Sequence, residues 1–231
     1  MAENTENGIR GKEYPEEIFF EDGRYRQLMM EYRCAILELE TKFRVLDTEF
    51  SLQHNRNPIE TIKTRLKSPH SIVEKIQRKG WELSPESIEK NMSDIAGVRV
   101  ICSFPEDIYT LARQLSQQDD ILVVEVKDYI RDPKPNGYRS LHLILEIPIF
   151  LSQKKKHVRA EVQFRTIAMD FWASLEHKLK YKQDIGNADR IAEELKICAD
   201  TICHVDHRMQ EIRRMIENRP GGVQNPEEPD V

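Results

Sequence analysis

The residues best suited to chemistry alternate along one predicted strand, residues 158–165. Its apolar positions share one face, and they are Val158, Ala160, Val162 and Phe164. The polar positions share the other face, and they are Arg159, Glu161, Gln163 and Arg165. A carboxylate and an amide between two guanidinium groups could serve a metal ion or an anionic substrate. The solvated face of a one-sided antiparallel sheet would look similar, so this strand alone leaves both interpretations open.

A second acidic residue, Asp94, stands just before another predicted strand, residues 97–103. Here Val98, Val100 and Cys102 form the apolar set, while Arg99 points the other way. An Asp at a strand entrance and Glu161 on a neighbouring strand could together hold a hard divalent cation. Mg²⁺ suits such a pair, because it is usually bound by one or two carboxylates together with substrate phosphates.

A basic cluster surrounds the start of a predicted helix at Ser68-Pro69, which read as N-cap and first helical position. Ser71 and Lys75 lie four residues apart, so they share a helix face near its positive end. The cluster also contains Arg65, Lys67, Arg78 and Lys79. Free backbone N–H groups beside several cations make a polyphosphate site plausible, although a solvated basic face has the same composition.

A loop rich in Pro and Gly over residues 132–137 precedes a predicted strand that carries His142. The loop would present Lys134, Asn136 and Tyr138. A loop tyrosine can stack on a purine, and Lys and Asn can contact phosphate or base edges. An ordinary turn with a packed tyrosine remains the alternative.

Hydrophobic periodicity predicts the elements that must position these groups. Strands are predicted over residues 61–67, 97–103, 121–126, 139–149 and 158–165. Helices are predicted over 28–50, 68–80, from 84, over 105–117, from 167 with a break at 184–187, and over 188–218. We therefore expect an α+β fold, with a mixed sheet of about five strands surrounded by helices and the last two strands adjacent.

Composition limits the class of protein. The chain has 231 residues, a net charge of −5, 39% hydrophobic and 32% charged residues. This is enough for one domain, which we place at 15–218 between disordered tails at 1–14 and 219–231. We find no signal peptide, no membrane span and no disulfide pattern among the four cysteines, which predicts a cytoplasmic protein. The acidic balance argues against DNA as a partner.

Four segments together resemble the synthetase domain of the RelA/SpoT family, and most closely the stand-alone small alarmone synthetases of bacteria. In chain order they are RLKSPHSIVEK, DIAGVRV, KPNGYRSLH and EVQFRTIAMDFWASLEHKLKY. The resemblance implies a mixed sheet related to that of nucleotidyltransferases. It also implies transfer of pyrophosphate from ATP to the 3′-hydroxyl of GDP or GTP, giving AMP and ppGpp or pppGpp.

The resemblance assigns roles by motif position. Asp94 and Glu161 would bind Mg²⁺, and Glu161 would also activate the attacking hydroxyl. The ATP site would comprise Arg65 and Arg99 on the adenine and Lys67, Ser71, Lys75 and Arg78 on the phosphates. The GDP/GTP site would comprise Tyr138 under the guanine together with Lys127, Lys134, Asn136, His142, Gln163 and Asp170. Asp170 stands where some relatives have Asn, and Lys127 where some have Arg; lysine keeps the charge but loses the bidentate fork.

Further expectations follow from the same resemblance. The long first and last helices would assemble a homotetramer. The chain contains no His-Asp dipeptide, so we expect no alarmone hydrolase activity. RNA binding stays open, with nothing in the sequence to indicate it.

Two other functions fit the sequence less well, and one further cluster could bind a metal. An RNA-directed nucleotidyltransferase should carry a paired Asp-x-Asp entered by Gly-Ser or Gly-Gly, which is missing here. A silent nucleotide- or RNA-binding regulator would not need both Asp94 and Glu161. Cys203 and His207, near Cys198 and His204, form an i,i+4 pair that could bind a soft metal, but the set lacks a complete four-ligand pattern.

Overall fold

The computed structural model describes residues 20, 22–54, 56–180 and 188–217. The predicted tails at 1–14 and 219–231, and the predicted helix break at 184–187, lie outside the described residues. Among the residues that the structure describes, no helix has both the length and the apolar character needed to span a bilayer.

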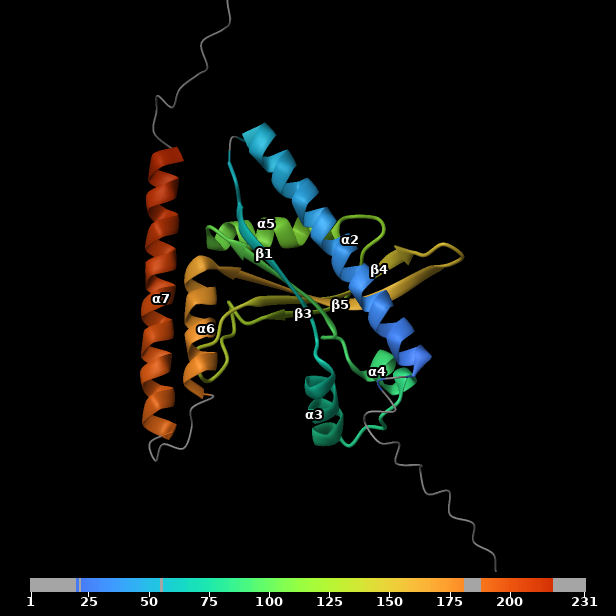
Figure 1. Cartoon of the computed structure of the whole chain (residues 1–231). Coiled ribbons are helices and arrows are strands. Elements are labelled where there is room, and N and C mark those ends of the chain that lie inside the picture. The colour runs from blue at the N-terminus through green and yellow to red at the C-terminus, as the bar shows by residue number, and fades with distance from the viewer. Residues whose placement is uncertain (1–19, 21, 55, 181–187, 218–231) are drawn as a thin grey trace, which may run out of the picture.

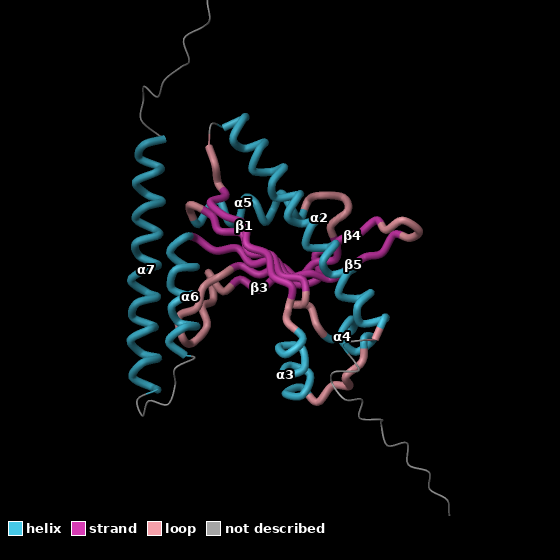
Figure 2. Tube along the Cα trace, in the orientation of Figure 1, coloured by secondary structure: helices cyan, strands magenta, loops and turns pink. Residues whose placement is uncertain are grey.

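The described elements occur in the predicted order (Figures 1 and 2). The helices are α2 (Gly23–His54), α3 (Pro69–Lys79), α4 (Pro85–Asn91), α5 (Pro105–Ser116), α6 (Ile167–Lys180) and α7 (Ala188–Glu217). The strands are β1 (Ile59–Leu66), β2 (Ala96–Cys102), β3 (Leu122–Asp128), β4 (Leu141–Phe150) and β5 (Lys155–Thr166).

The five strands form one mixed sheet in the order β1-β2-β5-β4-β3. Neighbouring strands are antiparallel except for the central pair, β2 and β5, which run parallel. The predicted fold class is thus confirmed, and the last two strands do form an antiparallel pair.

Strand β5 begins three residues earlier than predicted. The basic segment 153–156 was expected to be the turn, but Lys155 and Lys156 already pair with Phe150 and Ile149. The turn is tighter than the charge pattern indicates, because the Leu151 N–H donates to the Lys154 carbonyl at 2.9 Å and closes it.

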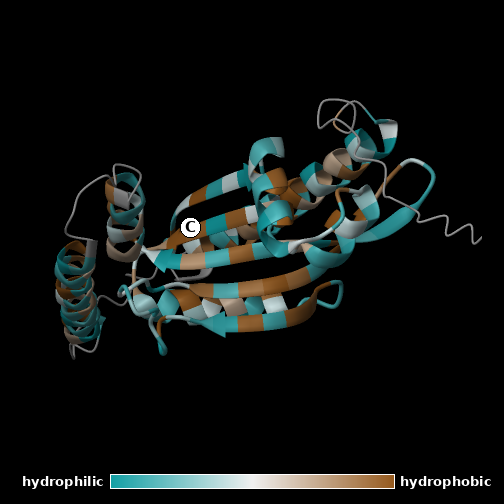
Figure 3. Cartoon of the chain, turned by 90° about the horizontal axis from the view of Figure 1, so that it is seen from below, coloured by the Kyte–Doolittle hydropathy of each residue, from teal (hydrophilic) through white to brown (hydrophobic). Residues whose placement is uncertain are grey.

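One face of the sheet carries the core. Helix α2 packs along β1, β2, β4 and β5, and α5 packs against β2 and β5. Phe43 of α2 meets Phe164 of β5 edge-on, with ring centroids 5.6 Å apart. The predicted apolar sets of β2 and β5 are buried in this cluster, and Figure 3 shows the alternation of apolar and polar residues along the strands. The polar residues of the same strands consequently face the opposite side.

The helix that carries the basic cluster has both predicted ends. The Ser68 hydroxyl accepts from the Ser71 N–H, Pro69 follows at the first helical position, and Gly80 closes α3 in the left-handed conformation at φ 66°. These signals place the N-terminus of α3 directly after β1, beside Lys67.

Helices α6 and α7 lie side by side at one end of the sheet (Figures 1 and 2). The Thr166 hydroxyl joins them to the end of β5 by donating to Asp206 of α7 at 2.6 Å. The same hydroxyl accepts from the Met169 N–H at 3.1 Å in the first turn of α6. A single side chain thus links the strand, the helix that follows it and α7.

Candidate active site

Strand register brings the predicted polar residues to one face of the sheet. Across β1 and β2, Arg65 lies opposite Gly97, and Lys63 lies opposite Arg99. Continuing across the sheet, the aligned pairs are Gly97 with Glu161, Arg99 with Gln163, His142 with Gln163 and Lys127 with His142. The predicted basic, acidic and acceptor-binding residues therefore form a continuous polar band across five strands.

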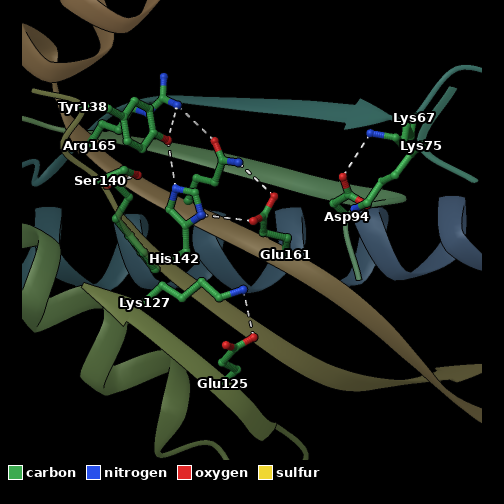
Figure 4. Close-up of polar contacts among 12 residues, drawn as sticks. Lys67, Lys75, Asp94, Glu125, Lys127, Tyr138, Ser140, His142, Glu161 and Arg165 are labelled. Carbon is green, nitrogen blue, oxygen red and sulfur yellow. Dashed lines mark hydrogen bonds and ion pairs between the residues drawn. The ribbon is translucent and has the colours of Figure 1, made fainter. Parts of the chain in front are cut away.

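Glu161 lies at the centre of this band (Figure 4). Its Oε1 lies 3.1 Å from His142 Nδ1, and its Oε2 accepts from Gln163 Nε2 at 2.9 Å. Burial raises the pKa of the Glu161 carboxyl, but the hydrogen bonds from His142 and Gln163 outweigh it and leave the pKa below its ordinary value. Glu161 is thus held as a carboxylate in a half-buried position.

Asp94 is held by two lysines from different elements. Lys75 of α3 lies 2.7 Å from Oδ1, and Lys67, just after β1, lies 3.0 Å from Oδ2. Burial raises the pKa of Asp94, but the hydrogen bonds from Lys75 and Lys67 outweigh it, so the net shift is downward. The negative charge of Asp94 opposes the lowering of the Glu161 pKa.

The other side of Glu161 leads to a tyrosine. Tyr138 Oη lies 2.9 Å from His142 Nε2 and accepts from Arg165 Nη2 at 2.7 Å (Figure 4). Because ionised Glu161 can only accept, the proton on His142 belongs on Nδ1, and Nε2 then accepts from the tyrosine hydroxyl. The hydrogen bonds therefore run in one direction: Arg165 donates to Tyr138, Tyr138 donates to His142, and His142 donates to Glu161.

Asp170 of α6 anchors the cationic side of the band. Its Oδ1 accepts from Arg165 at 3.0 Å and from Arg99 at 3.2 Å, and Lys63 lies 2.7 Å from Oδ2. Burial raises the pKa of Asp170. The hydrogen bond from Lys63 and the charges of Arg99 and Arg165 outweigh this effect, so the pKa lies below its ordinary value. In this arrangement Asp170 orients three cations; its role toward guanine stays a prediction.

The remaining acceptor-site candidates surround Tyr138. Lys134 Nζ stacks on the rings of Tyr129 and Tyr138, at 4.6 and 4.9 Å from their centroids. Asn136 Nδ2 donates to Glu176 of α6 at 2.9 Å. On the other side of His142, Lys127 Nζ pairs with Glu125 at 2.9 Å.

The ATP-site candidates lie toward β1 and α3. Arg65 is exposed beside Gly97, which lies between Arg65 and Glu161 in the cross-strand register. Because Gly97 has no side chain, no side chain projects from β2 at this position. Ser71 lies in the first turn of α3, and Arg78 lies exposed in its last turn. Arg78 therefore lies about one helical turn beyond Lys75, the residue of α3 that contacts Asp94.

The donor set fits Mg²⁺ shared with substrate. Within the described residues, no group of three or more His, Cys, Asp or Glu side chains could hold a metal ion by itself. Asp94 and Glu161 offer two hard oxygen donors amid cations that would bind phosphates, which is the arrangement Mg²⁺ uses with nucleotides. The Cys203–His207 pair has its imidazole Nδ1 2.7 Å from the Cys203 carbonyl and 3.6 Å from the sulfur.

Two cations of the network were not assigned a role from the sequence. Lys63 sits two residues before Arg65 on the same strand face, and Arg165 two residues after Gln163. Period-two alternation could have identified both, because it places them on the faces that already carry candidates.

Comparison with known proteins agrees with the geometry. Residues 64–186 match the family model described as a region found in RelA/SpoT proteins. The GTP pyrophosphokinase YwaC of Bacillus subtilis is 46% identical over 193 residues, which is 84% of this chain and 92% of that protein. A second protein of the same organism, the GTP pyrophosphokinase YjbM, is 36% identical over 85% of this chain and 92% of its own length.

Solved structures show the same fold. The small alarmone synthetase 2 of Bacillus subtilis superposes with a TM-score of 0.74 at 45% identity, covering 83% of this chain and 98% of that one. The small alarmone synthetase 1 of the same organism, bound to its product pppGpp, gives a TM-score of 0.77 at 35% identity, covering 85% and 100%. With the motifs on one face of the same sheet and a family match over more than half its length, this chain belongs to the RelA/SpoT family.

Proposed function

We propose that this protein is a (p)ppGpp synthetase without alarmone hydrolase activity, transferring pyrophosphate from ATP to the 3′-hydroxyl of GDP or GTP. The observation that carries the proposal is a pair of carboxylates amid cations: Asp94, just before β2, pairs with Lys67 and Lys75, and Glu161 lies on the polar face of β5. The relatives named GTP pyrophosphokinases, and the solved relative bound to pppGpp, support the same reaction.

The reaction is a substitution at the β-phosphorus of ATP. The 3′-oxygen of the acceptor forms a bond to that phosphorus, and the bond from it to the oxygen shared with the α-phosphate breaks, releasing AMP. Glu161, which the His142 and Gln163 hydrogen bonds keep ionised, accepts the proton of the 3′-hydroxyl. Positioning and charge neutralisation supply most of such catalysis, because phosphoryl-type transfer needs little covalent help.

The residues on either side of Glu161 would bind the two nucleotides. On the ATP side, Arg65 and Arg99 would hold the adenine, and the triphosphate would lie against Lys67, Ser71, Lys75 and Arg78. On the acceptor side, Tyr138 would stack under the guanine, with Lys127, Lys134, Asn136, His142, Gln163 and Asp170 around it. Asp94 and Glu161 would hold Mg²⁺, which would neutralise phosphate charge.

We also propose assembly through the two long helices into a homotetramer. Helix α2 exposes Leu37, Val45 and Leu52 on its outer surface, and α7 exposes Ile197, Val205, Met209, Ile212, Met215 and Ile216. Apolar side chains in such numbers along two helices are typical of surfaces that another protein covers.

The test is separation of nucleotides by anion exchange after incubation with ATP, GDP or GTP, and Mg²⁺. We expect AMP to appear in step with a guanosine tetra- or pentaphosphate, and to disappear when EDTA removes the divalent ion. Unchanged nucleotides, with both still bound by the protein, would overturn the proposal in favour of a silent regulator.

A further inference from the structure

The loop that carries Tyr138 rests directly on α7. Gly137 has φ +87°, a conformation that side chains rarely adopt. A Cβ placed on Gly137 would lie 2.5 Å from Ala199 Cβ and 3.4 Å from Lys196 Cα. The backbone of the loop thus approaches the helix as closely as a glycine allows, and Ala199, itself buried, defines the distance.

Arg139 fastens this contact from the other side of Tyr138. Its Nη1 donates to the Gly137 carbonyl at 3.2 Å and to the Ala199 carbonyl at 3.5 Å. Its Nη2 donates to Asp200 Oδ1 at 3.1 Å, and only 13% of the Arg139 side chain is exposed. One guanidinium therefore joins the turn of the loop to two consecutive residues of α7.

Helix α6 also contacts the loop that carries Tyr138. Glu176 accepts from Asn136 at 2.9 Å. Trp172, Ala173 and Ala199 form a second apolar cluster, against which Tyr138 packs from the loop. The Trp172 indole donates to the Leu195 carbonyl at 2.9 Å, which fixes α6 to α7 at the same level. The loop is thus held between two helices that carry none of the proposed metal ligands or ATP contacts.

We infer that Ala199 and Asp200 of α7 are positioning residues for the acceptor nucleotide, acting through Gly137 and Arg139 on the ring of Tyr138. This inference rests on the proposed function, since it takes Tyr138 as the platform for guanine. A change at this part of α7 should alter the KM for GDP and GTP while leaving the KM for ATP in place.

The sharpest test is Ala199→Val, with Ala192→Val as control. Ala192 lies exposed on the same helix, so the control reproduces the loss of helix propensity without the contact. Added methyl groups in a packed contact should displace the loop, and we expect the KM for GDP to rise about five- to tenfold. The KM for ATP should stay within about twofold. An equal rise in both, or no change in either with the fold intact, would overturn the inference.

A second substitution avoids any steric effect on folding. Asp200→Asn removes the charge that Arg139 meets and Asp200→Glu restores it, while Asp189→Asn changes an exposed Asp in the first turn of α7. We expect about a two- to threefold higher KM for GDP in Asp200→Asn, because the pair is partly exposed, and recovery in Asp200→Glu. Equal behaviour of Asp200→Asn and Asp189→Asn would contradict the role of Asp200.

Two further measurements keep the outcomes distinct. Sedimentation and circular dichroism of each variant show whether α7 remains folded and whether the assembly is unchanged; the kinetic comparison uses variants that pass both. Equilibrium binding of GDP, measured by calorimetry, should weaken in parallel with the KM. A wild-type protein that forms no alarmone would defeat the proposed function, whereas normal alarmone synthesis with an unshifted acceptor KM in Ala199→Val would defeat this inference alone.

Discussion

His142 Nδ1 lies 3.1 Å from Glu161 Oε1, and the two residues stand on neighbouring antiparallel strands. The other imidazole nitrogen is engaged by Tyr138, so the ring has a donor side toward the proposed base and an acceptor side toward the proposed platform. The proposed base and the proposed guanine platform are thus connected through one imidazole. A displacement of Tyr138 would therefore also change the support of Glu161.

Glu161→Gln should abolish transfer while leaving the fold and nucleotide binding largely intact. The amide has the shape of the carboxylate but can neither accept the hydroxyl proton nor bring charge to the proposed Mg²⁺. We expect at least about a 10²- to 10⁴-fold lower kcat, the usual contribution of general base catalysis. Anion-exchange assays measure the rate, and near-normal turnover would reject the role of Glu161.

Tyr138→Ala should raise the KM for GDP and GTP far more than that for ATP. Stacking of a base on an aromatic ring contributes about 1–3 kcal/mol, so we expect roughly a five- to hundredfold effect. Tyr138→Phe is the matched control, because it keeps the ring and removes only the hydroxyl that meets His142 and Arg165. Equal effects of Tyr138→Ala on the two substrates would remove the stacking assignment.

Gly97→Ala separates stability from activity. The new Cβ would meet only the Arg65 carbonyl oxygen, at an ordinary 3.4 Å, so the folded state tolerates it. Removing a glycine should raise the free energy of unfolding by about 0.4–1 kcal/mol. The methyl group would nevertheless project between Arg65 and Glu161, where we propose that ATP binds. We therefore expect the KM for ATP to rise. An unchanged KM for ATP would show that nothing binds over this position.

The stability of the fold should decrease at acidic pH because the ionisation of Glu31 is lost there. Its buried carboxylate accepts from Lys156 at 2.6 Å, Lys154 at 3.0 Å and Gln27 at 3.1 Å. Burial raises the pKa of Glu31, but these hydrogen bonds outweigh it and bring the pKa below its ordinary value. The stability from ionised Glu31 is therefore complete above the unfolded pKa of about 4.3 and is lost as pH falls through the lower folded pKa.

Glu31→Gln tests this linkage through urea unfolding at neutral and acidic pH. We expect a loss of about 1–3 kcal/mol near pH 7, with a difference from the wild type that shrinks below about pH 4. Glu60→Gln, at an exposed position of β1, is the control. A difference independent of pH would mean that the charge of Glu31 contributes nothing.

Val45→Glu should dissociate the proposed assembly. Val45 is 61% exposed on α2, near Leu52 at 82%, and a buried unpaired carboxylate at an interface is costly. Sedimentation should show a smaller mass for Val45→Glu and an unchanged mass for Val124→Glu, which makes the same substitution at an exposed position of β3. An unchanged mass in Val45→Glu would exclude this face of α2 from the interface.

The local elements could be predicted because their signals are local. Ser68-Pro69 and Gly80 determine the ends of α3, and alternation in residues 158–165 places Glu161 and Gln163 on one face. The motifs then led to the two carboxylates and to most of their neighbours. The strand limits were less certain, as the start of β5 shows, because pairing with β4 extends the strand into a charged segment.

Long-range arrangement was not predictable from these patterns. Nothing in the alternation of β2 specifies β5 as its parallel neighbour, yet that pairing sets Gly97 opposite Glu161. The link from Asp170 to Lys63 joins residues 107 positions apart. The contact of Gly137 with Ala199 depends on the docking of α7, to which the sequence of the loop gives no clue.

The one-sided packing of the sheet has a consequence for how such an enzyme can change. The apolar faces of β2 and β5 pack with α2 and α5 in one core cluster, and the opposite faces carry the residues of the proposed site. Because successive side chains of a strand alternate between these faces, a residue on the catalytic side can be exchanged without altering the shape of the core. Substrate preference can therefore drift by single substitutions on one face, while the other continues to specify the same fold.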